Sequence, residues 1–376
     1  MFLRGPQHYS DRPERVEVIE THFAWVFLTR RYAYKMKKPM QQARMDYRTL
    51  ARRQRGCRNE IRLNRRLAPS VYLGVVPLSR TREGELRIGR GQEAVDSLVK
   101  MRRLPAVRML DRVIERRAVR AVDLESLMAV LAAFFRKARR WPMSGRVYQD
   151  RLRARILQNA KELRAHDLRL NRRRIDAVIR VQLEFLVRAS DALATRGDRL
   201  IEGHGDLRPE HVWLGPPPCV IDCLEFDRDL RRLDPAEEMA FLALECTRLG
   251  APDVAASLLQ RYRRAMRDRV PEALVHFYMS RLASTRAQIA AWHVRDPQFP
   301  RRRPWIARAN IYLADALRYG RLALGGFEEG RASSVVRAER PPLQQRSDRL
   351  ARQHAPQRLT EERRDRKRDE LARCSD

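Results

Sequence analysis

The segment from His204 to Asp227 constrains the fold more than any other part of the chain. It reads HGDLRPEHVWLGPPPCVIDCLEFD, in which the apolar runs VWL and CVI flank the turn-forming residues GPPP. Short apolar runs on either side of a glycine–proline turn predict a β-hairpin. Asp206 then lies before the first strand and Asp222 directly after the second, so both carboxylates are expected at the same end of the hairpin.

Two carboxylates held in this way suit the transfer of a phosphoryl group. One accepts or orients the proton of an attacking hydroxyl, and the other holds a divalent metal that bridges the phosphates. Such catalysis depends on positioning and charge stabilisation, so it needs a rigid loop and hairpin. The alternative interpretation is that Asp206 and Asp222 are ordinary loop carboxylates.

The first hundred residues show mainly strand-like patterns around one helix. Strands are expected at 15–21, 24–28, 32–36, 71–77, 85–89 and 97–104, and a long basic helix at 46–68. Within the third strand, side-chain alternation puts Lys35 and Lys37 on one face. The stretch 89–94 matches a G-x-G-x-x-A pattern, but it lacks the following helix of a βαβ unit, so we interpret it as a turn.

The rest of the chain is mostly helical. Helices are expected through 106–195 and 235–325, with short strands and turns at 200–230. Strands first and helices later predict an α+β protein of two lobes. We place a small mixed N-lobe at 1–103, a larger helical C-lobe at 104–330 and a charged tail at 331–376. We expect the tail to be disordered or loosely helical.

Charge and cysteine content restrict the class of protein. The chain has 79 Lys and Arg against 47 Asp and Glu, a formal net charge of +32. That charge can indicate nucleic-acid binding, but arginine is spread almost evenly along the chain, which argues against it. Five cysteines are an odd count and do not indicate a disulfide framework. Without a secretory pattern or an apolar run long enough for a bilayer, the chain is expected to be cytoplasmic.

The hairpin segment resembles the catalytic and metal-binding loops of the aminoglycoside phosphotransferase family, which has the protein-kinase-like two-lobed fold. The family pattern is His-Gly-Asp, four residues, an Asn, and an Asp at the end of an apolar strand. The stretches ETHFAWVFLTRRYAYKMKKP and EIRLNRRLAP resemble a branch of uncharacterised bacterial phosphotransferase-like proteins. Some members of that branch carry a fused P-loop kinase domain, which is not expected here because the chain has no Gly-Lys-Ser or Gly-Lys-Thr. The resemblance covers about residues 15–325.

The resemblance implies roles for the residues of the hairpin segment. Asp206 would be the catalytic Asp, in a loop where His204 is expected to form hydrogen bonds rather than act as an acid or base. Asp222 would bind the metal. Asp234 would brace the catalytic loop without reacting.

The resemblance also implies a nucleotide site in the N-lobe. Lys35 would pair with the α- and β-phosphates of ATP, and Glu60 on the next helix would hold Lys35 by an ion pair. The hinge whose backbone meets adenine would be the segment Val99, Lys100, Met101, Arg102 and Arg103.

His211 stands where the family has its Asn. An amide oxygen is a hard ligand that suits Mg²⁺, whereas imidazole favours transition metals. Either His211 is an indirect ligand, or the metal preference shifts toward Mn²⁺, with Glu225 as a further oxygen ligand. This departure also leaves open a pseudokinase that binds nucleotide without turnover.

Three other patterns have competing interpretations. A zinc site is conceivable from an H-x6-H-x7-C-x3-C array, but its cysteines straddle a predicted strand; its members are His204, His211, Cys219 and Cys223. The arginine-rich stretch 151–174 could bind polyanions, although such a face is more often solvated. An acid-rich segment could receive a polycationic acceptor, in spite of the basic chain; its members are Glu225, Asp227, Asp229, Glu237 and Glu238.

The sequence therefore predicts an ATP-dependent phosphotransferase that uses Mg²⁺, or Mn²⁺, and a small-molecule hydroxyl as acceptor. A nucleotide-binding pseudokinase is the first alternative, and an arginine-rich nucleic-acid-binding protein is the second. The acceptor and the oligomeric state do not follow from the sequence, and no membrane partner is expected.

Overall fold

The computed structural model describes residues 2–42, 45–165, 168, 170–295 and 302–338. Residues 1–325 form one compact unit and residues 326–376 a second, of which the described part is the end of helix α11 (Arg302–Ala338). From residue 339 onward, the predicted tail lies outside the described residues. Among the described helices, none combines the length and the apolar character needed to cross a bilayer.

Six antiparallel strands form one sheet in the order β1-β2-β3-β8-β6-β7. Their bounds are β1 Glu17–Glu20, β2 Ala24–Leu28, β3 Tyr32–Lys37, β6 Tyr72–Arg80, β7 Leu86–Ile88 and β8 Glu93–Arg102. One face packs on an apolar cluster that contains Phe27, Tyr34 and Leu98. The short 3₁₀ helices η1 (Phe2–Arg4) and η2 (Pro6–His8) precede the sheet, and Leu3 belongs to the same cluster.

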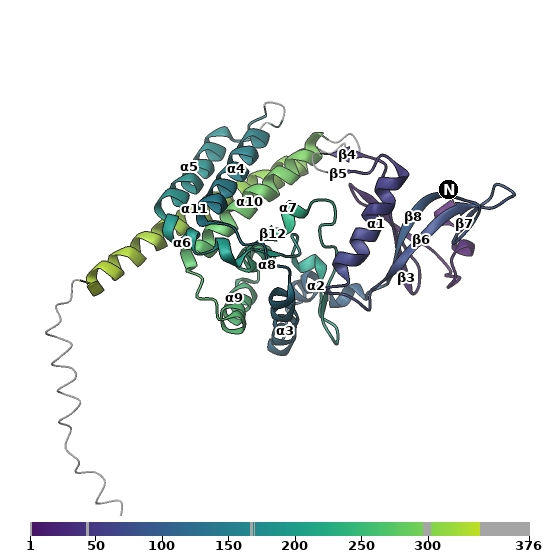
Figure 1. Cartoon of the computed structure of the whole chain (residues 1–376), viewed down its shortest axis with the longest axis horizontal. Helices are drawn as coiled ribbons and strands as arrows, with labels where there is room; N and C mark the ends of the chain where they lie inside the picture. The colour runs from purple at the N-terminus through teal and green to yellow at the C-terminus, as the bar shows by residue number, and fades with distance from the viewer. Residues whose placement is uncertain (1, 43–44, 166–167, 169, 296–301, 339–376) are drawn as a thin grey trace, which may run out of the picture. The chain divides into compact units, whose positions relative to one another are not determined.

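Helix α1 (Leu50–Asn64) packs on β6 and β8 (Figure 1). The predicted helix at 46–68 was wrong at both ends. It begins later because the two-residue strands β4 (Gln41–Gln42) and β5 (Met45–Asp46) pair, and because the Thr49 side chain accepts the Arg52 N–H as an N-cap. It ends earlier because the chain turns after Asn64.

Strands β6 and β8 are longer than predicted. β6 continues to Arg80 rather than residue 77, and β8 begins at Glu93 rather than residue 97, because Ser79 and Arg80 pair with Ala94 and Glu93. The turn expected at 89–94 is shorter: residues 89–92 connect β7 and β8, whereas Glu93 and Ala94 already belong to β8. Lys35 lies opposite Val26 of β2 and Val99 of β8, in the interior of the sheet.

Helices make up most of the rest of the first unit, after β8 (Figure 1). Their bounds are α2 Leu110–Glu115, α3 Ala121–Lys137, α4 Gly145–Leu163, α5 Arg172–Arg188, α6 Ser190–Ala194, α7 Arg228–Arg231, α8 Pro235–Arg248, α9 Pro252–Met266 and α10 Glu272–Arg295. The 3₁₀ turns that are described in full in this part of the chain are η3 Ala106–Arg108, η5 Gly197–Arg199 and η6 Pro209–His211. Amphipathic spacing explains their packing; α5, for example, buries Ile175, Val178 and Phe185, and Phe185 stacks on Phe277 of α10 at 4.6 Å.

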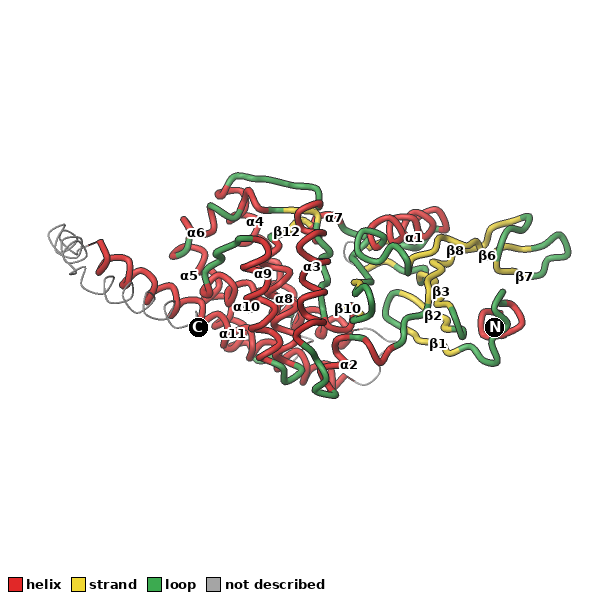
Figure 2. The backbone as a smooth tube through the Cα atoms, turned by 90° about the horizontal axis from the view of Figure 1, so that it is seen from below, coloured by secondary structure: helices red, strands yellow, loops and turns green. Residues whose placement is uncertain are grey.

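The predicted hairpin is present. β10 (Val212–Trp213) pairs with β11 (Cys219–Val220), and β9 (Ile201–Glu202) pairs with β12 (Arg232–Leu233). Figure 2 shows β10 at the border between the strands of the sheet and the helices. Asp206 precedes β10 and Asp222 follows β11, as expected. The predicted α+β architecture, with an antiparallel sheet followed by helices, is confirmed.

Candidate active site

Lys35 connects the sheet to the hairpin that carries Asp222. Its ammonium nitrogen lies 3.0 Å from Glu60 Oε1 and 2.5 Å from Asp222 Oδ1. Lys35 comes from β3 and Glu60 from α1, whereas Asp222 is far away in sequence. The structure thus brings together the three residues expected to bind phosphate, to hold the lysine and to bind metal.

Asp222 has a left-handed backbone, with φ at 62°. Asp and Asn adopt this conformation more readily than other non-glycine residues. Its N–H donates to the Tyr72 hydroxyl at 3.0 Å, which fixes the chain after β11. Burial alone would raise the pKa of Asp222, but Lys35 and His211 lower this pKa below its usual range. The carboxylate is therefore ionised at neutral pH.

A second lysine of β3, Lys37, is almost completely buried. Its ammonium group donates to Glu60 Oε2 at 2.6 Å and to the Glu225 carboxylate, which also accepts the Tyr47 hydroxyl at 2.7 Å. Burial opposes the charged lysine, but Glu225 and Glu60 raise the pKa of Lys37 above its ordinary value. Glu225 is thus held in a buried ion pair, and the structure gives no support to its expected role as a metal ligand.

His204 is buried between the catalytic loop and the hairpin. Its Nδ1 accepts the Asp206 N–H at 3.3 Å, and its Nε2 lies 2.9 Å from the Ile221 carbonyl oxygen. Burial, together with neighbouring His211, lowers the pKa of His204 to about 3, so the ring is neutral. A neutral ring satisfies both contacts when Nε2–H donates to Ile221. His204 therefore positions the loop, and its ring N–H is used in the hydrogen bond to the Ile221 carbonyl oxygen.

The Asp206 carboxylate faces two basic side chains. Arg208 Nε donates to Asp206 Oδ1 at 3.0 Å, and His211 Nδ1 lies 3.5 Å from Asp206 Oδ2. Burial would raise the pKa of Asp206, but Arg208, His211 and Arg286 hold this pKa below its usual range. Sequence reasoning missed Arg208, although its position two residues after Asp206 was a usable signal.

His211 lies between the two carboxylates. Its Nδ1–H donates to the Asp206 carbonyl oxygen at 2.9 Å, its Nε2 accepts from Arg208 Nη2 at 3.2 Å, and this Nε2 is 3.7 Å from Asp222 Oδ2. The lone pair that a metal would need is therefore directed at Arg208 in this structure. His211 occupies the place predicted for a metal ligand, but it could bind a metal only after Arg208 moves.

The residue that braces the loop of His204, Gly205 and Asp206 is Glu238, not Asp234. Glu238 Oε1, on α8, accepts the backbone N–H groups of His204, at 2.7 Å, and of Gly205, at 2.5 Å. Asp234 instead caps α8 and binds the Arg196 guanidinium. The expected role of Asp234 was wrong because Asp234 is the N-cap of α8, where its carboxylate accepts the Ala236 N–H and binds Arg196. Glu238, four residues later, reaches the loop instead.

Glu238 should make stability depend on pH. Burial raises the pKa of Glu238 to about 7, although the two loop N–H groups lower it. Because this folded-state pKa exceeds the ordinary value, the stabilisation is complete below about pH 4.5 and is lost as pH rises through about 7. The loss should be on the order of 3 kcal/mol. Urea unfolding of the wild type between pH 5 and 8.5 should show it, and Glu238→Gln should flatten that part of the profile.

Parallel pH profiles for the wild type and Glu238→Gln would contradict this assignment. Glu237→Gln is an unsuitable control, because Glu237 pairs with buried Arg281. Glu210→Gln is the better control, because Glu210 is exposed and the substitution should leave the wild-type pH dependence intact.

Helix α1 is bonded directly to the loop and the hairpin. Asn64 Oδ1 accepts the Cys223 N–H at 2.9 Å, while Asn64 Nδ2 donates to the Glu60 carbonyl oxygen at 2.9 Å. Arg66, just after α1, donates to the carbonyl oxygens of Glu202 and Gly203 at 2.7 and 2.9 Å. Neither residue was singled out from the sequence, because a side chain that bonds distant backbone leaves no local pattern.

The expected hinge lies mostly inside the sheet. Val99 pairs with Lys35 on one side and Val75 on the other, and Met101 likewise lies between two strands. Arg103 N–H donates to the Arg31 carbonyl oxygen at 2.9 Å. The backbone of these residues is therefore engaged in pairing. Beyond the strand, Leu104 packs with Trp213 and Ile221 against one apolar cluster.

The charges at the site fit a divalent cation with a nucleotide. The group has four carboxylates and three cations, an excess of one negative charge; the members are Asp206, Asp222, Glu60, Glu225, Lys35, Lys37 and Arg208. Within the described ranges, no three His, Cys, Asp or Glu side chains are grouped as a ready-made metal site. Mg²⁺ typically binds one or two carboxylates and completes its shell with water and phosphate oxygens, which this arrangement allows.

The zinc interpretation has no support in the described residues, since a structural zinc site needs four converging ligands. Cys223 Sγ instead donates to the His204 carbonyl oxygen at 3.2 Å. The rings of His204 and His211 are 6.2 Å apart between centroids.

Comparison with other sequences gives relatives of unestablished function. The chain is 30% identical over 281 residues to an uncharacterised protein of Mycobacterium tuberculosis, and a Mycobacterium bovis protein matches equally well. Each match covers 73% of this chain and 54% of the relative, so the chain spans about half the length of the curated relatives it matches. No protein-family model matches the chain.

Comparison with solved structures shows the fold. A choline kinase from Cryptosporidium parvum is similar with a TM-score of 0.51 and 9% identity, over 85% of this chain and 94% of that one. A glucosamine kinase bound to glucosamine, ADP and inorganic phosphate has a TM-score of 0.47 and 15% identity, over 81% and 80%. The GDP complex of aminoglycoside 2'-phosphotransferase-IIIa has a TM-score of 0.45 and 16% identity, over 81% and 93%. At 9% identity, the similarity to the choline kinase concerns the fold alone.

Proposed function

Because the chain has the protein-kinase-like fold, we propose that it transfers the γ-phosphoryl group of ATP to a hydroxyl group of a small molecule. The observation that carries this proposal is the position of Lys35 between Glu60, at 3.0 Å, and Asp222, at 2.5 Å. Phosphoryl transfer on this fold requires such a lysine, its helix carboxylate and a metal-binding Asp at one place. The small and large lobes would be residues 1–103 and 104–330.

In the proposed reaction Asp206 receives the proton of the acceptor hydroxyl. The hydroxyl oxygen forms a bond to the γ-phosphorus, and the bond from that phosphorus to the bridging oxygen of ADP breaks. Asp206 is suited to this role because it is ionised and part of its side chain, 21%, is exposed. Arg208 holds the carboxylate in place through its 3.0 Å bond and lies where negative charge would develop.

Asp222 would hold the divalent cation, which supplies positive charge to the phosphates. The Asp222 side chain suits this role because 45% of it is exposed while its pKa is lowered. Lys35 would turn from Asp222 to the phosphates and keep its contact with Glu60. Lys37 keeps Glu60 paired throughout, so the movement of Lys35 leaves no buried carboxylate without a cation.

Lys35→Met tests the nucleotide site. Loss of the Lys35 ammonium group should raise the Kd for ATP by about 10–100-fold, because a charge-assisted hydrogen bond contributes about 1.5–3 kcal/mol. Removal of divalent metal by EDTA should abolish turnover, and Mg²⁺ or Mn²⁺ should restore it. ATP binding by calorimetry and γ-phosphate transfer from labelled ATP to a panel of hydroxyl compounds measure the two effects. Lys137→Met, at the exposed end of α3, is the control.

The same measurements separate the alternatives. ATP binding that depends on Lys35, without turnover of any acceptor, would identify a pseudokinase, for which the contact of His211 with Arg208 is the structural reason. No ATP binding would refute the proposal. We also propose a cytoplasmic location, because the four described cysteines are buried free thiols, as expected under reducing conditions.

A further inference from the structure

Four arginines gather around the segment that follows Asp222. They come from α4, β12 and α10, and α4 packs on α10 (Figure 1). We call them the arginine cluster: Arg151, Arg155, Arg232 and Arg281. Two carboxylates face them, those of Asp229 and Glu237.

One carboxylate, that of Asp229, is shared by three of these arginines. Arg151 Nη1 lies 2.9 Å from Asp229 Oδ1, Arg155 Nη2 lies 3.5 Å from Asp229 Oδ2, and Arg232 Nη1 is 4.0 Å from Oδ1. Arg151 and Arg155 also donate to the Asp229 carbonyl oxygen at 2.6 and 2.8 Å. A single carboxylate has too few oxygen lone pairs in suitable directions for three guanidinium forks.

The fourth member, Arg281, is buried against Glu237, and only 8% of its side chain is exposed. Within the described part of the chain, the Nε–H groups of Arg151, Arg232 and Arg281 are buried without an acceptor. A buried donor without an acceptor is costly, so three such groups at one place indicate that an acceptor is missing.

The charges of the cluster do not balance. Among the ion pairs of the described residues, four guanidinium groups face two carboxylates. Burial, followed by the neighbouring Arg155, lowers the pKa of Arg151 to about 10. The positive charge is therefore disfavoured in this structure, and an anion would relieve it.

We propose that the arginine cluster binds a phosphate or carboxylate group carried by the small-molecule acceptor, an inference that rests on the proposed function. Guanidinium forks match the oxygen pairs of both groups. Access exists from the rim, where 30% of the Arg232 side chain and 37% of the Asp229 side chain are exposed. Along the chain the cluster adjoins the candidate site, because Asp229 follows Asp222 by seven residues and Glu237 precedes Glu238, which accepts the loop N–H groups.

The acid-rich segment that could have received a polycation is already neutralised. Glu225 pairs with Lys37, Asp229 with Arg151, and Glu237 with Arg281. The other two acids serve the backbone: Asp227 caps α7, and Glu238 accepts the two loop N–H groups. Each of the five carboxylates therefore has a partner, although one oxygen of Glu237 and one of Glu238 are buried without a hydrogen bond to another described residue. The four converging guanidinium groups favour an anionic acceptor over a cationic one.

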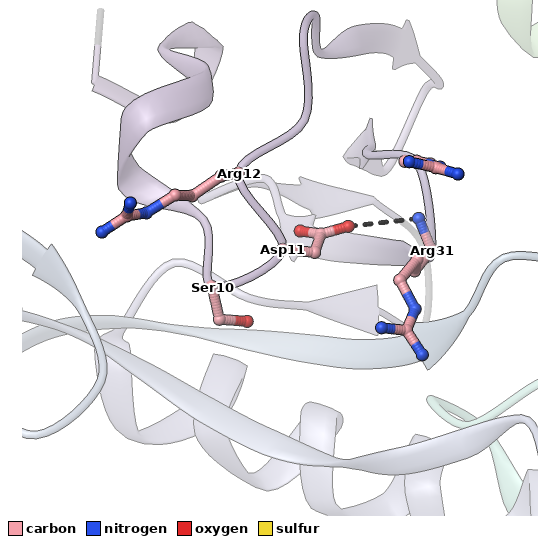
Figure 3. A pocket seen from close by; sticks show the side chains of 5 residues that line it. Ser10, Asp11, Arg12 and Arg31 are labelled. Atoms are coloured by element: carbon pink, nitrogen blue, oxygen red, sulfur yellow. Dashed lines mark hydrogen bonds between the residues drawn. The ribbon is translucent and has the colours of Figure 1, made fainter.

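A second group of arginines supplies the matched control. An open pocket at the turn between β2 and β3 is lined by Ser10, Asp11, Arg12, Arg30 and Arg31 (Figure 3). Its arginines are exposed, and Figure 3 shows Arg12 and Arg31 extending in different directions. Asp11 accepts the Arg31 N–H at 3.1 Å and the Thr29 hydroxyl at 2.7 Å. This group shares the charge of the arginine cluster but not its burial or its convergence.

The test is binding of inorganic phosphate to the full 376-residue chain without nucleotide or metal, by isothermal titration calorimetry. Arg151→Gln, and separately Arg232→Gln, should raise the Kd for phosphate by about tenfold. Arg30→Gln should leave this Kd unchanged, and so should Lys35→Met, which removes phosphate binding at the nucleotide site. Thermal unfolding of each variant checks the fold. No phosphate binding, or binding that depends on Lys35 and not on Arg151 and Arg232, would overturn the proposal.

Turnover assays then separate this inference from the proposed function. Hydroxyl compounds with a phosphate or carboxylate group should have higher kcat/KM than amino sugars, and Arg232→Gln should raise KM for the anionic compounds while kcat stays unchanged. Preference for amino sugars, with KM insensitive to Arg232→Gln, would refute the anionic acceptor and leave the phosphotransferase intact. Phosphate binding through Arg151 and Arg232 without any turnover would refute the function and leave the anion site.

Discussion

Asp206→Asn should lower the rate of phosphoryl transfer by about 10³-fold while leaving the affinity for ATP nearly unchanged. Asparagine keeps the shape of the side chain and one oxygen for Arg208, but it cannot accept the proton of the acceptor hydroxyl.

Asp222→Asn should lower the rate of phosphoryl transfer by a similar factor. It should also weaken metal-dependent ATP binding, because it removes the ionised carboxylate beside Lys35. Single-turnover transfer from labelled ATP and calorimetric titration of ATP with metal measure the two effects.

Glu210→Gln is the matched control for Asp206→Asn. Glu210 contacts the same guanidinium of Arg208, at 3.4 Å, but 41% of its side chain is exposed. Its replacement should change the rate little. If Asp206→Asn and Glu210→Gln had similar rates, Asp206 would not be the proton acceptor, and another group would have to take that role.

Arg196→Met should lower the free energy of unfolding by about 3–5 kcal/mol. Arg196 binds both Asp234 oxygens at 2.6 and 2.7 Å and both Asp268 oxygens at 2.8 Å, and only 4% of the residue is exposed. Burial opposes the charge of Arg196, but Asp234 and Asp268 raise its pKa. Methionine would leave buried Asp234 without its cation and buried Asp268 with only the half-exposed Arg199. Urea unfolding monitored by circular dichroism measures the loss.

Arg199→Met provides the comparison. Arg199 contacts Asp268 at 3.4 Å, but 47% of its side chain is exposed, so its loss should cost about 0–1 kcal/mol. Equal destabilisation by the two substitutions would mean that the buried network around Arg196 contributes no more than a surface ion pair.

Sequence reasoning was strongest where a local pattern carries the geometry. The hairpin at 212–220 followed from two apolar runs and a proline-rich turn. The alternation of β3 put Lys35 and Lys37 on one face, and both contact Glu60. The α+β, protein-kinase-like fold followed from strands that precede helices and from the resemblance, and it is confirmed.

Sequence reasoning was weakest where a side chain binds groups far away in sequence. The loop brace was assigned to Asp234, but distance along α8 decides which carboxylate reaches the loop, and that residue is Glu238. Glu225 was expected to bind a metal because it follows Asp222 by three residues, but its carboxylate accepts hydrogen bonds from Lys37 and Tyr47. The convergence of arginines around Asp229 was also hidden, because an even spread of arginine along the sequence says nothing about which arginines converge in space.

The bonds from Asn64 and Arg66 to the hairpin and the catalytic loop have a consequence for motion. Along the chain, α1 belongs to the proposed small lobe, but these two residues fasten its C-terminal end to the segment that carries the reacting groups. Opening between the lobes would have to break these bonds, whereas tilting of the sheet over α1 would not. The helix is therefore tied on both sides, because Glu60 also binds Lys35 and Lys37 of the sheet, and any relative motion of the sheet and the hairpin would have to break contacts at one face of α1.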